Sequence, residues 1–116
     1  MHSMNRLEKS ISNYAQPARG ESVHSEKRDP DSDEFLLMSI GNSQDSEAFD
    51  ALFQRYSSKI YAMGMKLTRN DQLSKDLVQE TMINVWRKAR LYDLDRGSAQ
   101  SWIFTAARNR CFDMLR

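Results

Sequence analysis

The C-terminal stretch "AQSWIFTAARNRCFDMLR" carries side chains that could contact a nucleic acid. On a helical wheel its polar face holds Asn109 and Arg116, with Arg108 and Arg110 at the edges and Trp102 in the first turn. An asparagine amide can read a base edge, guanidinium groups bind phosphates, and an aromatic ring can stack on a base. The same residue types also make up solvated helix faces with the tryptophan packed into the core. On composition alone, this second interpretation is the more common one.

The opposite face of the same stretch is apolar and is predicted to face a core. It consists of Ile103, Phe104, Ala107, Cys111, Met114 and Leu115. We expect Cys111 to be a core residue rather than a nucleophile, because the chain's two histidines, His2 and His24, lie far upstream. A single cysteine forms no internal disulfide, which is typical of a reducing cytoplasm. Without a cluster of cysteines and histidines, neither a metal site nor another cofactor is predicted.

The stretch "DLVQETMINVWRKAR", which begins at Asp76, is also predicted to be helical, but one residue lies on an unexpected side. Its core-facing stripe consists of Val78, Met82, Val85, Trp86 and Ala89. Ile83 falls on the other side, among Asp76, Gln79, Arg87 and Arg90. A β-branched apolar residue among charges is either a stray surface residue or the apolar centre of a binding patch with a polar rim.

These two stretches belong to a predicted set of four helices without strands. The first is "DSDEFLLMSIG", with acidic residues at its N-terminal end and Gly41 placed to end it. The second begins near Asp45 or Ser46. Its apolar residues recur at steps of three and four: Phe49, Leu52, Phe53, Tyr56, Ile60, Met63 and Leu67.

The third helix is predicted to start after an N-cap at Asn70 or Asp71 and to end near Arg90. The segment "LYDLDRGS" is a loop by composition. Ser98 is then the expected N-cap of the last helix, which reaches Arg116 without a stop signal. We therefore expect the natural chain to continue beyond this residue.

Composition divides the 116 residues into two parts. Residues 1–30 mix Ser, Pro, Gly and both charges with few apolar residues, which is typical of a disordered tail. Residues 31–116 are predicted to form one compact all-α bundle of three to four helices. The net charge of +1 is unevenly distributed: residues 31–53 carry six acids and no base, whereas residues 87–116 carry seven bases and three acids. This asymmetry favours an anion-binding end. Neither a signal peptide nor a membrane span is predicted.

Several of these motifs, taken in order, resemble region 2 of bacterial sigma factors, and in particular the small extracytoplasmic-function (ECF) group. The motifs are "YSSKIYAMGMKLTRN", the Asp-x-x-Gln-Glu and Trp of "DLVQETMINVWRKA", and the Trp-Ile and Arg-Asn-x-x-x-Asp-x-x-Arg of "SWIFTAARNRCFDMLR". The resemblance covers about residues 34–116. It implies a cytoplasmic protein that binds core RNA polymerase and directs it to promoters.

The resemblance also assigns roles to individual positions. In the family, the helix matching "DLVQETMINVWRKAR" docks on the clamp helices of the beta-prime subunit of the polymerase. Carried over by position, Asp76, Gln79 and Glu80 are the expected polymerase contacts. The helical wheel adds Ile83 as the apolar centre and Arg87 in the polar rim. This is the same face on which the wheel placed Ile83, so the resemblance implies that a partner covers that residue.

The other surface of the family recognises and melts the minus-ten promoter element, and holds a flipped base of the non-template strand. The positions that match base contacts are Tyr92, Ser98, Trp102 and Asn109. Arg108 and Arg116 match phosphate contacts. Primary sigma factors have an aromatic pair where this chain has Ser101 and Trp102, so strand opening would depend on one tryptophan.

Two other classes of function stay open on the sequence. A sigma-like decoy domain would bind an anti-sigma factor without contacting DNA, although such decoys typically lose the basic Arg-Asn face. An unrelated helical adaptor would have the basic end as mere solvated surface. An anti-sigma factor is also a possible partner of a true sigma factor. Enzymatic activity is not predicted, since no nucleophile–base pair and no Gly-rich phosphate loop occur.

Overall fold

The structure is a computed structural model that describes residues 29–116. Four α-helices make up most of this part: α3 (Asp33–Ser43), α4 (Ser46–Thr68), α5 (Asp71–Lys88) and α6 (Ala99–Met114). Two single 3₁₀ turns, Ala89–Leu91 and Leu94–Arg96, lie between α5 and α6. No strand occurs in the described residues, so the predicted all-α bundle is confirmed. The predicted tail lies outside them, apart from its last two residues.

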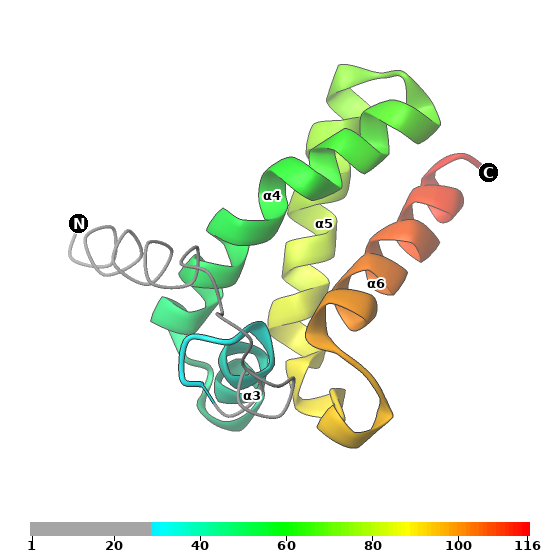
Figure 1. The fold of residues 1–116 in the computed structure, drawn as a ribbon. Helices are drawn as coiled ribbons and strands as arrows, with labels where there is room; N and C mark the ends of the chain where they lie inside the picture. Colours follow the sequence, from blue (N-terminus) through cyan, green and yellow to red (C-terminus); the bar gives the residue numbers. More distant parts are fainter. Residues whose placement is uncertain (1–28) are drawn as a thin grey trace, which may run out of the picture.

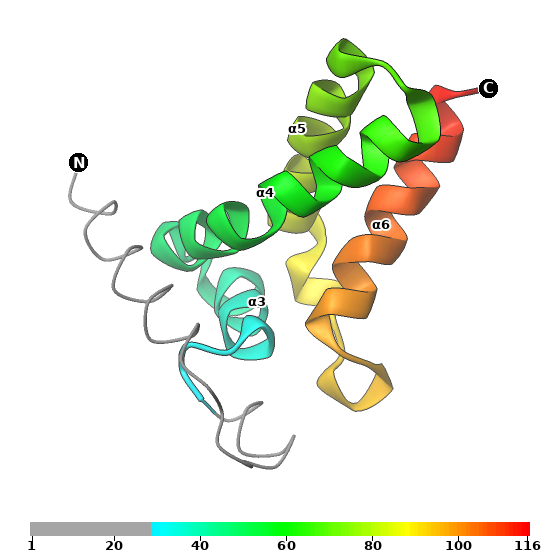
Figure 2. The same cartoon turned by 45° about the horizontal axis from the view of Figure 1, so that its top comes forward.

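Helices α4 and α5 form an antiparallel pair joined by a tight turn, and α6 lies beside α5 (Figure 1). Helix α3 lies against the start of α4, as both views show (Figure 2). The loop between α5 and α6 is at the same end of the bundle as α3 (Figure 1). The C-terminal half of the chain therefore places α5, the loop and α6 next to one another.

The predicted N-caps Asn70 and Ser98 and the predicted start of the second helix near Asp45 are confirmed, and each of these side chains accepts hydrogen bonds from free backbone N–H groups. Asp45 accepts from Glu47 and Ala48 at 3.1 Å, Asn70 from Leu73 at 2.8 Å, and Ser98 from Ser101 at 3.1 Å. The capping roles of Asp45 on α4 and of Ser32 on α3 were not predicted. The third helix ends as α-helix at Lys88 and tightens into a 3₁₀ turn before the loop.

The prediction that Gly41 ends the first helix is wrong. Helix α3 continues to Ser43 and ends at Gln44, which adopts the left-handed conformation at φ 53°. Gly41 instead allows a close approach: a Cβ there would lie 2.8 Å from the carbonyl carbon and oxygen of Ala89. That distance is well inside van der Waals contact. The glycine is needed where α3 crosses the turn after α5.

A similar close approach joins α4 to α5 near the turn between them. A Cβ added to Gly64 would lie 2.9 Å from the Cα, Cβ and Oγ atoms of Ser74, which is fully buried. The Ser74 hydroxyl satisfies its own hydrogen-bonding need by donating to the Asn70 carbonyl at 2.7 Å. Small residues on both helices thus let the two backbones pack closely.

The core contains most of the residues that the helical wheels predicted. The fully buried large side chains are Leu37, Ile40, Leu52, Tyr56, Ile60, Leu77, Met82, Val85 and Ile103. Cys111 is also fully buried, as predicted, and burial raises the pKa of its thiol. The core assignments of Leu67 and Leu115 are wrong, because these side chains are 41% and 49% exposed. Both lie at the ends of their helices.

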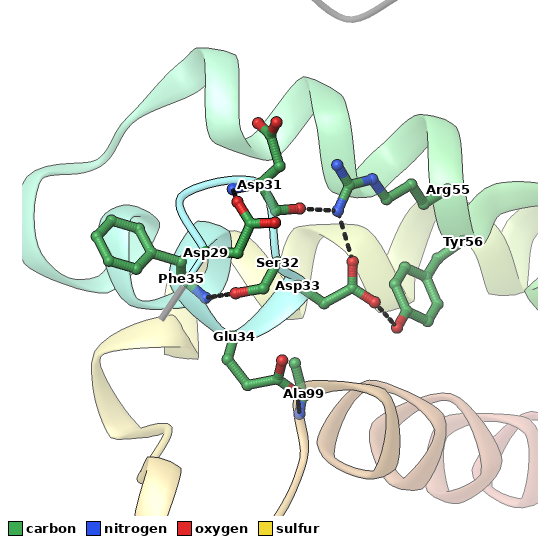
Figure 3. A network of polar contacts seen from close by, with 9 residues as sticks. All are labelled: Asp29, Asp31, Ser32, Asp33, Glu34, Phe35, Arg55, Tyr56 and Ala99. Atoms are coloured by element: carbon green, nitrogen blue, oxygen red, sulfur yellow. Dashed lines mark hydrogen bonds and ion pairs between the residues drawn. The ribbon is translucent and has the colours of Figure 1, made fainter. Parts of the chain in front are cut away.

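A buried polar network fixes α3 to α4 and α6 (Figure 3). The Asp33 carboxylate accepts from the Tyr56 hydroxyl and, at 2.7 Å, from the Arg55 guanidinium. The neighbouring Glu34 accepts from the backbone N–H of Ala99 at 2.9 Å, across 65 positions of sequence. The acids were predicted only as favourable charges at a helix N-terminus. The partners of Asp33 fix α3 to α4, and the bond of Glu34 holds the start of α6 in place.

Candidate nucleic-acid interface

A groove of about 750 Å³ runs between α5, the loop and α6. We call it the α5–α6 groove. It is lined by Asn84, Lys88, Leu91, Tyr92, Asp93, Arg96, Gly97, Ser98, Ser101, Trp102, Thr105, Ala106, Asn109, Arg110 and Asp113. Its lining follows α6 from Ser98 to Asp113, roughly 22 Å at the helical rise. This volume is within the range of small-ligand sites.

Two aromatic side chains form one wall of the groove. The rings of Tyr92 and Trp102 pack edge to face, with 6.0 Å between centroids and 70° between planes. Both rings are half-buried and pack against the core as well as lining the groove. The two interpretations of Trp102 from the sequence, a core residue and a base contact, are therefore compatible. An aromatic wall of this kind suits stacking with a base.

The Tyr92 hydroxyl closes the loop by donating to the carbonyl oxygen of Gly97 at 2.7 Å. Burial, and after it the negative charges of Glu34 and Asp93, raise the pKa of Tyr92 to about 12. The hydroxyl is therefore protonated and able to donate at neutral pH. Gly97 itself has φ 153°, a conformation that residues with a Cβ rarely adopt.

The N-terminus of α6 is held by two side chains. Ser98 caps it from within the chain, and Glu34 of α3 accepts from the N–H of Ala99. Ser98 also lines the groove, so its predicted place beside the last helix agrees with the structure. Its hydroxyl already accepts one hydrogen bond as the cap, so the O–H donor and one acceptor lone pair are left for a ligand.

Four of the six predicted DNA contacts line the groove: Tyr92, Ser98, Trp102 and Asn109. Arg108 and Arg116 do not line it, although both side chains are exposed. The Nη1 atom of Arg116 lies 3.9 Å from Oδ1 of Asp113. An ion pair this long between exposed side chains contributes little to stability. The structure thus separates the amide, inside the groove, from the two arginines outside it.

The sequence-based prediction missed three basic residues that line the groove: Lys88, Arg96 and Arg110. Lys88 follows Asn84 by one helical turn on α5, and this spacing in the sequence could have indicated that the two side chains lie on the same face. Arg110 was noted only as an edge residue, whereas Arg96 lies in a loop without periodicity. Asp93 and Asp113 also line the groove, so its charge is mixed with a small positive excess.

The predicted polymerase-binding face of α5 lies largely open. Ile83 is 41% exposed, in agreement with the wheel, and Gln79 and Arg87 are exposed. Asp76 is half-buried and accepts from Gln72 at 2.9 Å within the same helix. Glu80 differs from the other four because it forms an ion pair with Arg110 of α6. It therefore lies at the border between this face and the groove.

Two further results limit the kind of site. Among the described residues, no group of three His, Cys, Asp or Glu side chains could hold a metal ion. No helix within residues 29–116 is long and apolar enough to cross a membrane. His2 and His24 lie outside this part of the chain. The fold and the groove together define a small helical binding domain.

Comparison with known proteins shows the family to which this chain belongs. The family model for Sigma-70 region 2 matches residues 52–116, more than half of the chain. The ECF RNA polymerase sigma factor RpoE of Cereibacter sphaeroides is 40% identical over 81 residues, which are 70% of this chain and 45% of RpoE. The ECF sigma factor SigK of a Mycobacterium species (strain KMS) is 36% identical over 73 residues, 63% of this chain and 38% of SigK.

A solved structure supports the same assignment. Rhodobacter sphaeroides SigE, in complex with the anti-sigma ChrR, is similar with a TM-score of 0.62 and 39% identity. The similarity covers 65% of this chain and 48% of the SigE chain. The chain belongs to the sigma-70 family through region 2, and its relatives are ECF sigma factors. It spans less than half the length of these relatives.

Proposed function

We propose that this chain is the domain of an ECF sigma factor that binds core RNA polymerase and holds the opened minus-ten strand of a promoter. Residues 31–116 would form this domain, with residues 1–30 as a separate tail. The observation that carries the proposal is the α5–α6 groove, in which an aromatic wall, the Asn109 amide and basic side chains line one space of about 750 Å³. The family and the ECF relatives favour this use of the groove.

The groove suits a base that has left the duplex. Unstacking a base costs a few kcal/mol, which stacking on an aromatic ring and base-edge hydrogen bonds can offset. Trp102 offers the ring and Asn109 offers both a donor and an acceptor. Arg108, exposed on α6, and Arg116, exposed just after the end of α6, lie outside the groove and would contact phosphates of the neighbouring nucleotides. Strand opening would then depend on one aromatic residue, Trp102.

The other half of the proposal concerns α5. Its face around Ile83 would bind the clamp helices of the beta-prime subunit, with Asp76, Gln79, Glu80 and Arg87 around the apolar centre. An exposed isoleucine with a polar rim has the usual composition of a binding patch. Binding to the polymerase would place the protein in the cytoplasm.

An anti-sigma factor is a second proposed partner. It is favoured by one observation: the similar SigE structure is a complex with an anti-sigma. A decoy that binds only such a factor would have no use for a groove with an asparagine amide and three basic residues. We therefore place the DNA-holding function first.

The test combines core RNA polymerase, the chain and a random-sequence pool of single-stranded DNA. Bound DNA is recovered and sequenced, with core polymerase alone as the background. The proposal expects a short motif that is enriched only when the chain is present, and that is lost with Trp102→Ala. A chain that binds polymerase without enriching any motif would contradict DNA holding. A chain that binds neither, but captures an anti-sigma factor, would support the decoy function.

A further inference from the structure

Glu80 and Arg110 connect the two surfaces of the domain. The Glu80 carboxylate on α5 forms an ion pair with the Nη2 of Arg110 on α6. Arg110 lines the α5–α6 groove, whereas Glu80 does not. Both side chains are about one third exposed (36% for Arg110 and 39% for Glu80), so the pair lies at the groove's border rather than in the core.

Arg110 has hydrogen-bonding capacity that the domain itself does not use. A guanidinium carries five N–H donors in a planar fork, and the ion pair with Glu80 involves one nitrogen. The Nε atom of Arg110 is buried and has no hydrogen-bond partner. A buried donor without an acceptor is unfavourable, so the guanidinium gains if it turns this N–H toward a bound group with oxygen acceptors. The groove is where such a group would meet this side chain.

The geometry points to Arg110 as a nucleotide-contacting residue of the groove and to Glu80 as its positioning residue. This inference rests on the proposed function and adds a residue pair to it. Glu80 holds one side of the guanidinium, which fixes the orientation of the remaining donors toward a phosphate or a base oxygen. Glu80 is also one helical turn from Ile83, so the proposed polymerase-binding face borders the side chain that orients Arg110.

The experiment uses the full chain and a short, mixed-sequence single-stranded DNA. Fluorescence anisotropy gives the affinity, and NMR follows the Arg110 Nε–H and the Trp102 indole N–H. The test variant is Glu80→Ala. The matched control is Asp76→Ala, one turn away on α5, which removes the same charge from a residue that does not line the groove and accepts a hydrogen bond from Gln72 of its own helix. Arg110→Lys, which keeps the charge but not the fork, is the second test variant.

Removal of an acid would by itself strengthen DNA binding, because it makes the chain more positive. We expect the opposite for Glu80→Ala: binding weaker than that of Asp76→Ala by about threefold to tenfold, at an unchanged melting temperature. The same loss is expected for Arg110→Lys. In the parent chain, DNA should shift the Arg110 Nε–H. In Glu80→Ala this signal should broaden in the free chain, while the Trp102 indole still responds to DNA.

The outcomes distinguish this inference from the proposed function. If DNA shifts the Trp102 indole but not the Arg110 Nε–H, or if Glu80→Ala binds as tightly as Asp76→Ala, the role of the pair is wrong and the groove's function stands. If DNA shifts neither signal, the proposed function fails, and this inference fails with it.

Discussion

The ring of Tyr92 meets the indole of Trp102 edge to face, with their centroids 6.0 Å apart. One residue belongs to the loop and the other to the first turn of α6. Their contact, together with the hydrogen bond from Tyr92 to Gly97, joins the loop to the helix along one wall of the groove. The shape of the groove therefore depends on Tyr92 even if this residue never touches a ligand.

Tyr92→Phe tests the hydrogen bond separately from the ring contact. The substitution removes the donor to Gly97 and keeps the aromatic pair. We expect the free energy of unfolding to fall by about 1 kcal/mol, the typical net value of one hydrogen bond. Chemical denaturation measures it. An unchanged stability would show that the hydroxyl bonds equally well to water.

The pKa of Tyr92 predicts a pH effect with a definite sign. Because the folded chain raises this pKa from 10.0 to about 12, the folded state holds the phenol proton at pH values where the unfolded state has lost it. Stability should therefore fall as pH rises between 10 and 12, and this part of the loss should be absent in Tyr92→Phe. Denaturation of both chains across this range, with tyrosinate absorbance as the titration signal, checks the prediction. Equal slopes would contradict it.

Gly41→Ala tests the close approach of α3 to the turn after α5. Alanine favours a helix by about 1 kcal/mol over glycine, so propensity alone predicts stabilisation. The added Cβ would lie 2.8 Å from backbone atoms of Ala89, which cannot move as a flexible side chain can. We expect a net loss of about 1–3 kcal/mol, as for other overpacked sites. Ser43→Ala, at an exposed position of the same helix, is the control and should be nearly neutral.

Ile83→Glu tests the proposed polymerase-binding face. The side chain is exposed, so the substitution should leave the melting temperature unchanged. It should weaken binding to core RNA polymerase at least about tenfold, or about 1.4 kcal/mol. Leu67→Glu is a matched control, because Leu67 has the same 41% exposure on a different helix and should not affect binding. A chain that unfolds with Ile83→Glu, or equal effects of the two substitutions, would contradict the proposal.

The sequence predicted the helices and most of the core because both depend on local information. Helical periodicity and N-cap residues such as Asn70 and Ser98 are visible without a structure. The end of α3 was missed because Gly41 has two physical uses, to stop a helix or to allow close packing. Only the position of Ala89 decides between them.

The part of the candidate site that depends on local sequence information was also predictable. Asn109 and Trp102 could be placed from the helical wheel and the family resemblance. Arg96 and the Glu80–Arg110 pair could not, because they depend on how the loop and two helices meet in space. The bonds of Asp33 to Tyr56 and of Glu34 to Ala99 are likewise long-range. No spacing in the sequence indicates them.

We propose that the groove reads a base, whereas the arginines outside the groove hold the DNA backbone. Asn109 of α6 lines the groove, whereas Arg116, two residues beyond the end of α6, does not, so Asn109→Ala and Arg116→Ala are compared directly. The most direct measurement is the binding of single-stranded minus-ten variants to the complex of chain and core polymerase at several salt concentrations. Asn109→Ala should lose roughly 1–3 kcal/mol of discrimination between bases. Arg116→Ala should weaken all variants alike and reduce the salt slope by about one. If Asn109→Ala leaves the order of affinities for the DNA variants unchanged, base reading by this residue is contradicted. No effect of either substitution would contradict DNA binding by this face.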